Sequence, residues 1–271
     1  MRLVTFFAAL WALLLAGPVT AASLIFGVQD FTKDPRMVAL EMRGVAAYLS
    51  QQLGEPVVVE AAKNPKLFMQ GVKSHRYDFI YGPPNVALKA EQIGGYQPVA
   101  RIHGQIKGVF IALNSSGIKT VADMKGKRLG MPAPAALITV LADAKLRAMK
   151  IDPQTYFSKI TSFTGPDDMI YALKLGLVDV GVTAARFYQV WTKEGAPIHA
   201  VLDTEGSPHQ TFSASPRLSP ALRVKLTDAL VAGPKTPVMA EFLKSRGFPP
   251  EIDTATPADY VALAHMMAAH P

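Results

Sequence analysis

A short residue pattern occurs twice in this chain and places Asp78 and Asp179 at equivalent positions, 101 residues apart. Each copy has an apolar helical segment, a break, the aspartate, a strand of buried type and a turn of small residues that leads into another helix. Strands that alternate with helices build sheets with helices on their faces. Two copies therefore predict two similar α/β lobes. Because ligands bind beyond the carboxyl ends of such strands, two lobes are suited to hold a ligand between them.

The composition excludes several classes of site. The chain has no cysteine, so disulfides, thiolate metal sites and a lipoprotein anchor are impossible. Its formal net charge is +7, but the basic residues are scattered, and the densest cluster, 125–128, is typical of a solvated turn before a strand. Without a platform of basic and aromatic residues, we expect no nucleic-acid partner.

The first residues predict export. Arg2 provides a positive start, residues 3–16 are almost wholly apolar, and small residues follow at 19–22. This layout is typical of a secretory signal, and the apolar run is shorter than the roughly 20 residues that span a bilayer. We predict a signal peptide over 1–21 and a periplasmic protein. An uncleaved anchor is the alternative.

The order of the elements predicts two lobes, one inserted into the other. The first lobe takes 22–112 and 205–271, and the second takes 113–204. Each lobe is expected to have a mainly parallel sheet flanked by helices, and two crossing segments would permit hinge bending and resist rotation. The predicted strands are 24–28, 57–59, 79–81 and 99–102 in the first lobe, and 128–131, 159–162, 178–183 and 199–202 in the second, with 109–113 as a crossing strand. The main predicted helices of the second half are 134–149, 166–175, 184–194, 219–231 and 257–270.

Three segments resemble a known family. Residues 77–87, 121–130 and 172–180 are similar to the phosphate, phosphite and phosphonate type of substrate-binding proteins of ABC importers. The resemblance covers the whole predicted mature chain, and its middle segment is shared with many periplasmic binding proteins. It implies the type II periplasmic binding fold and a periplasmic receptor that closes on a small solute and presents it to a membrane permease.

The chain departs from the phosphonate binders at the turn that holds their ligand. In that family a turn of serine, threonine and glycine opens the first helix of the second lobe and binds the anion. The matching residues here, 131–137, have no hydroxyl and include two prolines, which lack amide donors. A serine–histidine pair of many members is replaced by Gly165 and Pro166. Because a buried anion needs such donors, we expect a ligand that is weakly charged or has a large apolar body.

Candidate ligand contacts lie where the predicted strands end. For Tyr81 the alternative is packing within the sheet, for Asn85 it is helix capping, and for Arg186 it is a surface position. A phosphonate would have to be held by Arg101 or Arg186. The full set of candidates is Gln29, Asp30, Phe31, Tyr81, Gly82, Pro83, Asn85, Arg101, Pro132, Ala133, Ala135, Thr164, Thr183, Ala184 and Arg186.

No residue pattern indicates catalysis. Asp78 and Asp179 precede their strands on the side away from the cleft, so we interpret them as structural. His265 and His270 have a spacing that aligns poorly as metal ligands, and no nucleophile elbow, phosphate loop or zincin helix is found. We therefore expect no enzyme activity, no cofactor and no metal, and we expect a monomer.

Three other functions stay open beside capture of a weakly charged or largely apolar solute for transport. The first is a phosphonate or phosphate receptor, the second is a protein that carries lipid or sterol, and the third is a sensory module for a signalling partner. The sequence does not separate transport from sensing.

Overall fold

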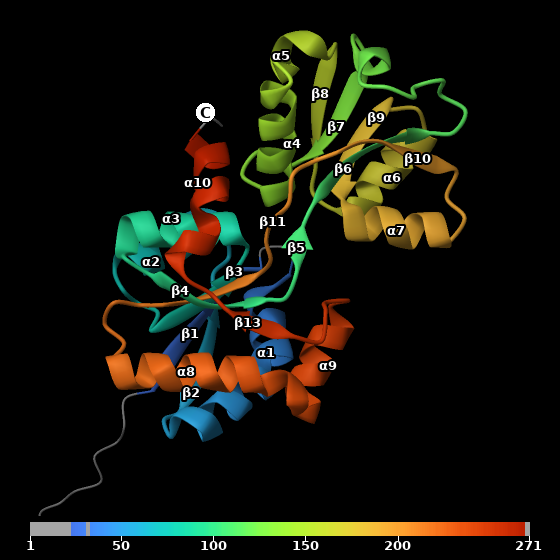
Figure 1. Cartoon of the computed structure of the whole chain (residues 1–271). Coiled ribbons are helices and arrows are strands. Elements are labelled where there is room, and N and C mark those ends of the chain that lie inside the picture. The colour runs from blue at the N-terminus through green and yellow to red at the C-terminus, as the bar shows by residue number, and fades with distance from the viewer. Residues whose placement is uncertain (1–22, 31–32, 269–271) are drawn as a thin grey trace, which may run out of the picture.

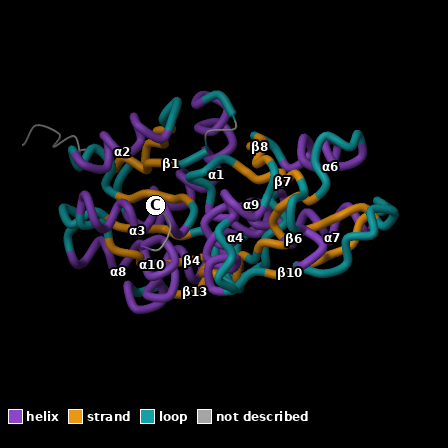
Figure 2. The backbone as a smooth tube through the Cα atoms, turned by 90° about the horizontal axis from the view of Figure 1, so that it is seen from above, coloured by secondary structure: helices purple, strands orange, loops and turns teal. Residues whose placement is uncertain are grey.

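The structure, a computed structural model, describes residues 23–30 and 33–268 and has two lobes, each built on its own sheet (Figure 1). Viewed from above, the labelled strands of the first sheet lie to the left and those of the second to the right (Figure 2). The predicted signal peptide and Phe31 lie outside the described residues. Within the described part of the chain, none of the helices is long and apolar enough to cross a membrane.

The first lobe contains a six-stranded sheet in the order β13-β4-β12-β3-β1-β2. β1 pairs in parallel with both β2 and β3, whereas β12 runs antiparallel to both β3 and β4. The strands are β1 Leu24–Val28, β2 Val57–Ala61, β3 Phe79–Gly82, β4 Gln97–Ile102, β12 Thr211–Ala214 and β13 Ile252–Thr254.

The second lobe contains a five-stranded sheet in the order β10-β6-β9-β7-β8. β7 pairs in parallel with β8 and β9, and β6 runs antiparallel to both β9 and β10. The strands are β6 Gly108–Leu113, β7 Arg128–Pro132, β8 Lys159–Phe163, β9 Val180–Ala184 and β10 Ile198–Asp203.

Each sheet contains one strand that arrives from the other lobe, and that strand is antiparallel. The carboxyl end of β4 faces the second lobe. The chain therefore enters the second sheet beside the carboxyl ends of β7 and β9. β6 must therefore run against those strands. β12 follows the crossing back from the second lobe, so it enters the first sheet beside the carboxyl end of β3 and runs antiparallel to it. The two sheets share one plan, as the repeated sequence pattern predicts.

The crossings lie close together. They contain the short strands β5 (Gln105–Ile106) and β11 (Ser207–Pro208), which pair antiparallel. Beyond them, the Gly108 N–H donates to the Thr204 hydroxyl at 2.8 Å, and the Thr204 N–H donates to the Gly108 carbonyl at 2.9 Å. β6 belongs to the second sheet, so we propose that the second lobe begins near Gly108 and not at 113.

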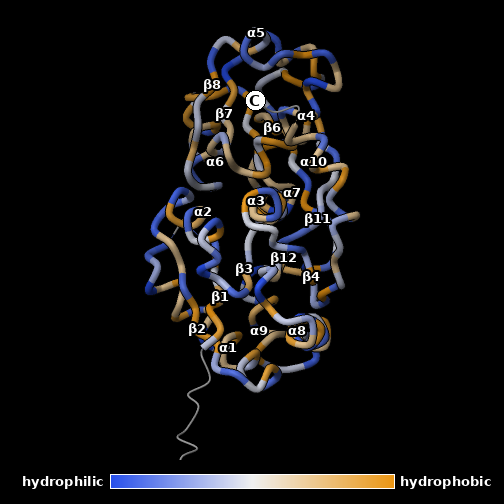
Figure 3. Tube along the Cα trace, turned by 90° about the vertical axis from the view of Figure 1, so that its left-hand side faces the viewer, coloured by the Kyte–Doolittle hydropathy of each residue, from blue (hydrophilic) through white to orange (hydrophobic). Residues whose placement is uncertain are grey.

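Helices cover both faces of the first sheet. α1, α8 and α9 pack on one face around Phe26, Leu49 and Phe212, and α2 and α3 pack on the other around Phe68 and Tyr96. Figure 3 shows hydrophobic stretches on α8 and α9 beneath this sheet. The helices are α1 Pro35–Leu53, α2 Pro65–Lys73, α3 Pro84–Gly94, α8 Pro220–Ala232 and α9 Pro237–Ser245, with the 3-10 turn η2 at Gly233–Lys235.

The second sheet is covered in the same way. Phe110 and Leu129 pack with α4 on one face, and Ile111 and Trp191 pack with α6 and α7 on the other. The helices are α4 Leu137–Ala148, α5 Pro153–Tyr156, α6 Pro166–Lys174 and α7 Ala185–Lys193, with the 3-10 turn η1 at Ala122–Met124.

The last helix contacts both lobes. After the 3-10 turn η3 (Pro257–Tyr260), α10 (Val261–Ala268) packs against α3 of the first lobe and α4 of the second (Figure 1). Leu263 is buried with Leu88 and Leu141, one from each of those helices. The helix therefore joins the two lobes at one end of the cleft.

Candidate ligand-binding cleft

A large cleft lies between the lobes and has a volume of about 1170 Å³. This slightly exceeds the roughly 300–1,000 Å³ of common small-molecule sites. Val28 and Tyr81 line it from the carboxyl ends of β1 and β3, and Thr164 lines it from just beyond β8. Its position is the one expected for ligands of open α/β sheets.

Eight of the predicted contact residues line this cleft. They are Gln29, Asp30, Tyr81, Asn85, Ala133, Ala135, Thr164 and Arg186. Six others in the described part of the chain do not line it: Gly82, Pro83, Arg101, Pro132, Thr183 and Ala184. That the eight residues contact a ligand stays a prediction.

Three of these six residues support the wall of the cleft without lining it. Gly82 lies in β3 opposite Thr211, and a Cβ at Gly82 would come within 3.0 Å of the Gln29 Cβ. Pro83 is the N-cap residue of α3, and Ala184 is that of α7. These residues allow their neighbours to reach the cleft.

Arg101 is held away from the cleft. Its guanidinium lies 3.2 Å from the Asp253 carboxylate and donates to the Gly104 carbonyl at 3.1 Å. Both contacts lie at the β4–β13 edge of the first sheet. Of the two arginines predicted to hold an anion, only Arg186 lines the cleft.

Arg186 presents a cation to the cleft from the first turn of α7. Its guanidinium lies 4.3 Å from the ring centroid of Phe187 and 5.7 Å from that of Phe248, and it donates to the Arg246 carbonyl at 3.1 Å. Among the described residues it has no carboxylate within ion-pair distance. Its side chain is exposed, yet desolvation by the surrounding protein atoms lowers its pKa.

Tyr81 lies at the floor of the cleft. Its ring packs against Phe212, with centroids 4.6 Å apart, and against Phe242 at 5.8 Å. The side chain is buried, and this desolvation raises the pKa of the phenol strongly, so the hydroxyl stays protonated and can donate a hydrogen bond. Both alternatives for Tyr81 therefore hold: it packs within the sheet and also lines the cleft.

Asn85 connects the two lobes. Its Nδ2 donates to the Ala135 carbonyl at 3.0 Å across the cleft. Because only the amide nitrogen can donate to a carbonyl, this contact orients Oδ1 the other way, where it is buried without a partner among the described residues. Asn85 is not the N-cap of α3, since Pro83 holds that position.

The turn before α4 offers few donors, as the sequence indicates. Residues 133–136 supply Ala and Pro side chains to the cleft, and Ala136 caps α4 without a side-chain hydrogen bond. The nearest hydroxyl, that of Thr139, lies 3.1 Å from the Pro132 carbonyl and 3.0 Å from the Ala133 carbonyl, both in the turn itself.

Comparison with known families identifies the chain. A family model described as "ABC transporter, phosphonate, periplasmic substrate-binding protein" matches residues 32–260. The chain belongs to this family. It is therefore a solute-binding protein of the kind that delivers a small ligand to a membrane transporter, and its family is periplasmic. A comparison with curated proteins finds no match.

Solved structures share the fold of this family member. A Xanthomonas citri protein bound to chloride has a TM-score of 0.77 at 15% identity, covering 91% of this chain and 96% of that chain. PhnD1 of Prochlorococcus marinus, in complex with methylphosphonate, has a TM-score of 0.76 at 13% identity, covering 91% and 97%. A binding protein component of an ABC phosphonate transporter from Pseudomonas aeruginosa has a TM-score of 0.73 at 15% identity, covering 92% and 87%.

Several residues of the cleft were missed from the sequence. Arg246 and Phe248 follow α9, where no strand end marks a binding position, and Gln210 precedes β12, a strand that the sequence did not reveal. Met42 is on the buried face of α1, so its helical spacing indicated only core packing. Pro134 and Ala136 belong to the turn that the sequence indicated, and the missed lining residues are Val28, Lys33, Val38, Met42, Pro65, Met69, Val86, Lys89, Val140, Gln210, Ser245, Arg246, Phe248 and Met267.

The cleft is basic. Its charged lining residues are the cations Lys33, Lys89, Arg186 and Arg246 and the carboxylate Asp30. Glu41 neutralises part of this charge, because it lies 2.6 Å from Lys33 and 3.4 Å from Arg246. Within the described residues, Lys89 and Arg186 have no such carboxylate, and they carry the uncompensated positive charge.

Proposed function

We propose that this family member binds an organic anion that has a single negatively charged group and a sizeable apolar part, and delivers it to a membrane permease. The charged group would pair with Arg186, and the apolar part would lie against the walls that Val38, Met42 and Val140 provide. The sequence predicted a ligand that is weakly charged or has a large apolar body. We now propose a ligand that has both a single charge and an apolar part.

The uncompensated guanidinium of Arg186 carries this proposal. A cation that is partly desolvated and lacks a carboxylate is less stable than a paired one, and an anionic ligand restores the pair. The proposal favours one negative charge over two, because the turn at 133–136 lacks the hydroxyls that a phosphonate dianion needs. Carboxylates, sulfonates and phosphonate monoesters meet this description.

Three further expectations from the sequence remain proposals. We propose that residues 1–21 are removed on export, which N-terminal sequencing of the exported protein would test. We also propose that the protein is a monomer without enzyme activity. Sensing for a signalling partner is compatible with the same cleft, and so is carriage of lipid or sterol.

The experiment is identification of the bound ligand followed by titration. Mass spectrometry of material released from the purified protein gives candidates, and calorimetry measures their affinity for the wild type and for Arg186→Gln. We expect the substitution to weaken binding of an organic anion about 10- to 100-fold, the range for a lost hydrogen bond to a charged group. Higher salt should weaken wild-type binding.

Arg43→Gln is the matched control, because Arg43 is exposed on α1 and does not line the cleft. Its affinity should equal that of the wild type. Release of a neutral lipid or sterol whose affinity is the same in Arg186→Gln would overturn the organic-anion proposal and favour the carrier alternative. Tight capture of inorganic phosphate would favour the phosphate-receptor alternative.

A further inference from the structure

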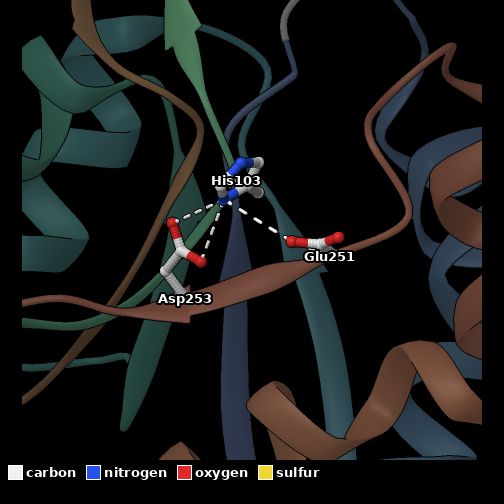
Figure 4. A group of neighbouring side chains, drawn as sticks. All are labelled: His103, Glu251 and Asp253. Carbon is white, nitrogen blue, oxygen red and sulfur yellow. Dashed lines mark hydrogen bonds and ion pairs between the residues drawn. The ribbon is translucent and has the colours of Figure 1, made fainter.

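A second group of chemically useful side chains lies outside the cleft. His103, Glu251 and Asp253 gather at the β4–β13 edge of the first sheet, and each offers one ligand atom within 4.8 Å of the others (Figure 4). We propose that this group binds a divalent transition-metal cation of the zinc type. The site is independent of the ligand that the cleft takes.

The register of two strands brings these residues together. β13 pairs antiparallel with β4 so that Ile252 is opposite Ile102 and Asp253 is opposite Arg101. One step further, the His103 N–H donates to the Glu251 carbonyl at 3.0 Å, so His103 is opposite Glu251. Opposite and diagonal neighbours on one face of an antiparallel pair are within side-chain reach. The backbone therefore presents the imidazole and both carboxylates on one face.

The spacing of the ligand atoms fits a small cation. His103 Nδ1 lies 3.1 Å from both oxygens of Asp253 and 3.7 Å from Glu251 Oε2. Zn²⁺ binds nitrogen and oxygen at about 2.0–2.2 Å, so ligand atoms at tetrahedral positions are about 3.4 Å apart. The observed separations lie on either side of that value, and small side-chain rotations would equalise them.

Arg101 orients one carboxylate without occupying all of it. Its guanidinium contacts Asp253 Oδ2 at 3.2 Å, which leaves Oδ1 for a cation. Carboxylates that bind metals are commonly held by such a hydrogen bond to their other oxygen. Two carboxylates and one guanidinium give a formal charge of −1, which suits a divalent cation.

The donor set selects the class of metal. One imidazole and two carboxylates suit Zn²⁺ and related transition ions, whereas Ca²⁺ and Mg²⁺ take oxygen ligands alone. Three protein ligands on an exposed edge leave at least one coordination position to water. His103 side-chain exposure is 52%, so an ion can reach the site from solvent.

The test is a calorimetric titration of the protein, without any affinity tag, with Zn²⁺. We expect one equivalent to bind to the wild type. His103→Asn should abolish this binding, and Glu251→Gln should weaken it at least 10-fold. Cobalt provides a second readout, because Co²⁺ bound through imidazole has visible absorption that His103→Asn should change.

His265→Asn is the matched control, since His265 is an exposed histidine that belongs to no ligand cluster among the described residues. It should bind Zn²⁺ like the wild type, and thermal unfolding should show all variants folded. Absence of Zn²⁺ binding by the wild type, unchanged binding by folded His103→Asn, or equal affinity for Ca²⁺ would each overturn the proposal.

Discussion

His209 is a buried histidine in which burial and charge act in the same direction. Desolvation, followed by the nearby cations Arg186 and Arg101, lowers its pKa from 6.5 to about 4. Its Nδ1 accepts the Gln210 N–H at 2.8 Å, which requires that nitrogen to be unprotonated, and its ring meets Phe248 edge to face at 5.0 Å. The neutral imidazole is therefore part of the folded structure.

This histidine predicts that stability falls with acid. Between pH 6.5 and pH 4 the unfolded chain binds a proton at His209 that the folded protein does not, so unfolding becomes more favourable as pH falls. From pH 7 to pH 5 the contribution of His209 should cost about 2 kcal/mol in the free energy of unfolding. Urea titrations at both pH values measure it.

His209→Asn is the comparison, because an amide oxygen can accept the same Gln210 N–H but does not titrate. The variant should lose about 2 kcal/mol less stability than the wild type over this range. An equal loss in both proteins would show that His209 is protonated in the folded state.

The roles of single residues were predictable where the repeated sequence pattern marks them. Asp78 and Asp179 were interpreted as structural, and the structure confirms it: Asp78 accepts the Ile25 N–H at 2.7 Å, and Asp179 accepts the Arg128 N–H at 2.9 Å. Arg101 and Arg186 could not be separated, because the partner of Arg101, Asp253, is 152 positions further along the chain.

At the scale of elements, one aromatic ring shows how α2 approaches its sheet. Tyr77 is buried between β1 and α2, and Gly27 and Gly71 make room for it. A Cβ on either glycine would lie 2.6 Å from the ring of Tyr77. The ring cannot move away, because it packs on Phe68 with centroids 5.3 Å apart.

Gly27→Ala should therefore lower the free energy of unfolding by about 1–3 kcal/mol, the usual cost of overpacking a core. Gly165→Ala is the control, since its new Cβ would meet only the exposed Asp168 carboxylate, at 3.3 Å, and a shift of that side chain by a few tenths of an ångström relieves the contact. Urea denaturation of the three proteins checks this. Equal stability of Gly27→Ala and Gly165→Ala would show that the ring of Tyr77 does not exclude a Cβ at position 27.

Most strands were predictable from the sequence, and two antiparallel strands of the first sheet were not. Every strand of the two parallel sets was expected close to its observed position, because buried strands read as apolar runs. β12 and β13 were missed, since they are short, interrupted by polar residues, and paired with the distant strands β3 and β4. α4 begins at Leu137, three residues later than expected, because the two prolines stand in the preceding turn.

At the scale of the molecule, α10 contacts both lobes and holds α3 of the first against α4 of the second. Its Leu263 is 1% exposed and packs with Leu88 of α3 and Leu141 of α4. Separation of α3 from α4 has to break one of these contacts. The sequence predicted a terminal helix, but nothing in it indicated that the helix contacts both lobes, because each contact is with a distant segment.

Leu263→Ala should loosen the lobes as well as the fold. We expect a loss of about 2–5 kcal/mol in unfolding free energy, as for other buried leucines, and a larger radius of gyration in X-ray scattering. Leu230→Ala is the control, because Leu230 is 0% exposed within the first lobe. It should lose similar stability and keep the wild-type radius. The same radius for both variants would contradict the bridging role.

The paired hydrogen bonds between Gly108 and Thr204 have a consequence for how such proteins can be rebuilt. They place the entry and exit of the second sheet's chain side by side. The stretch from 108 to 204 is thus delimited as one cassette that can be exchanged between related genes. Grafting the corresponding cassette of a relative would create a hybrid receptor in which each parent supplies one wall of the cleft.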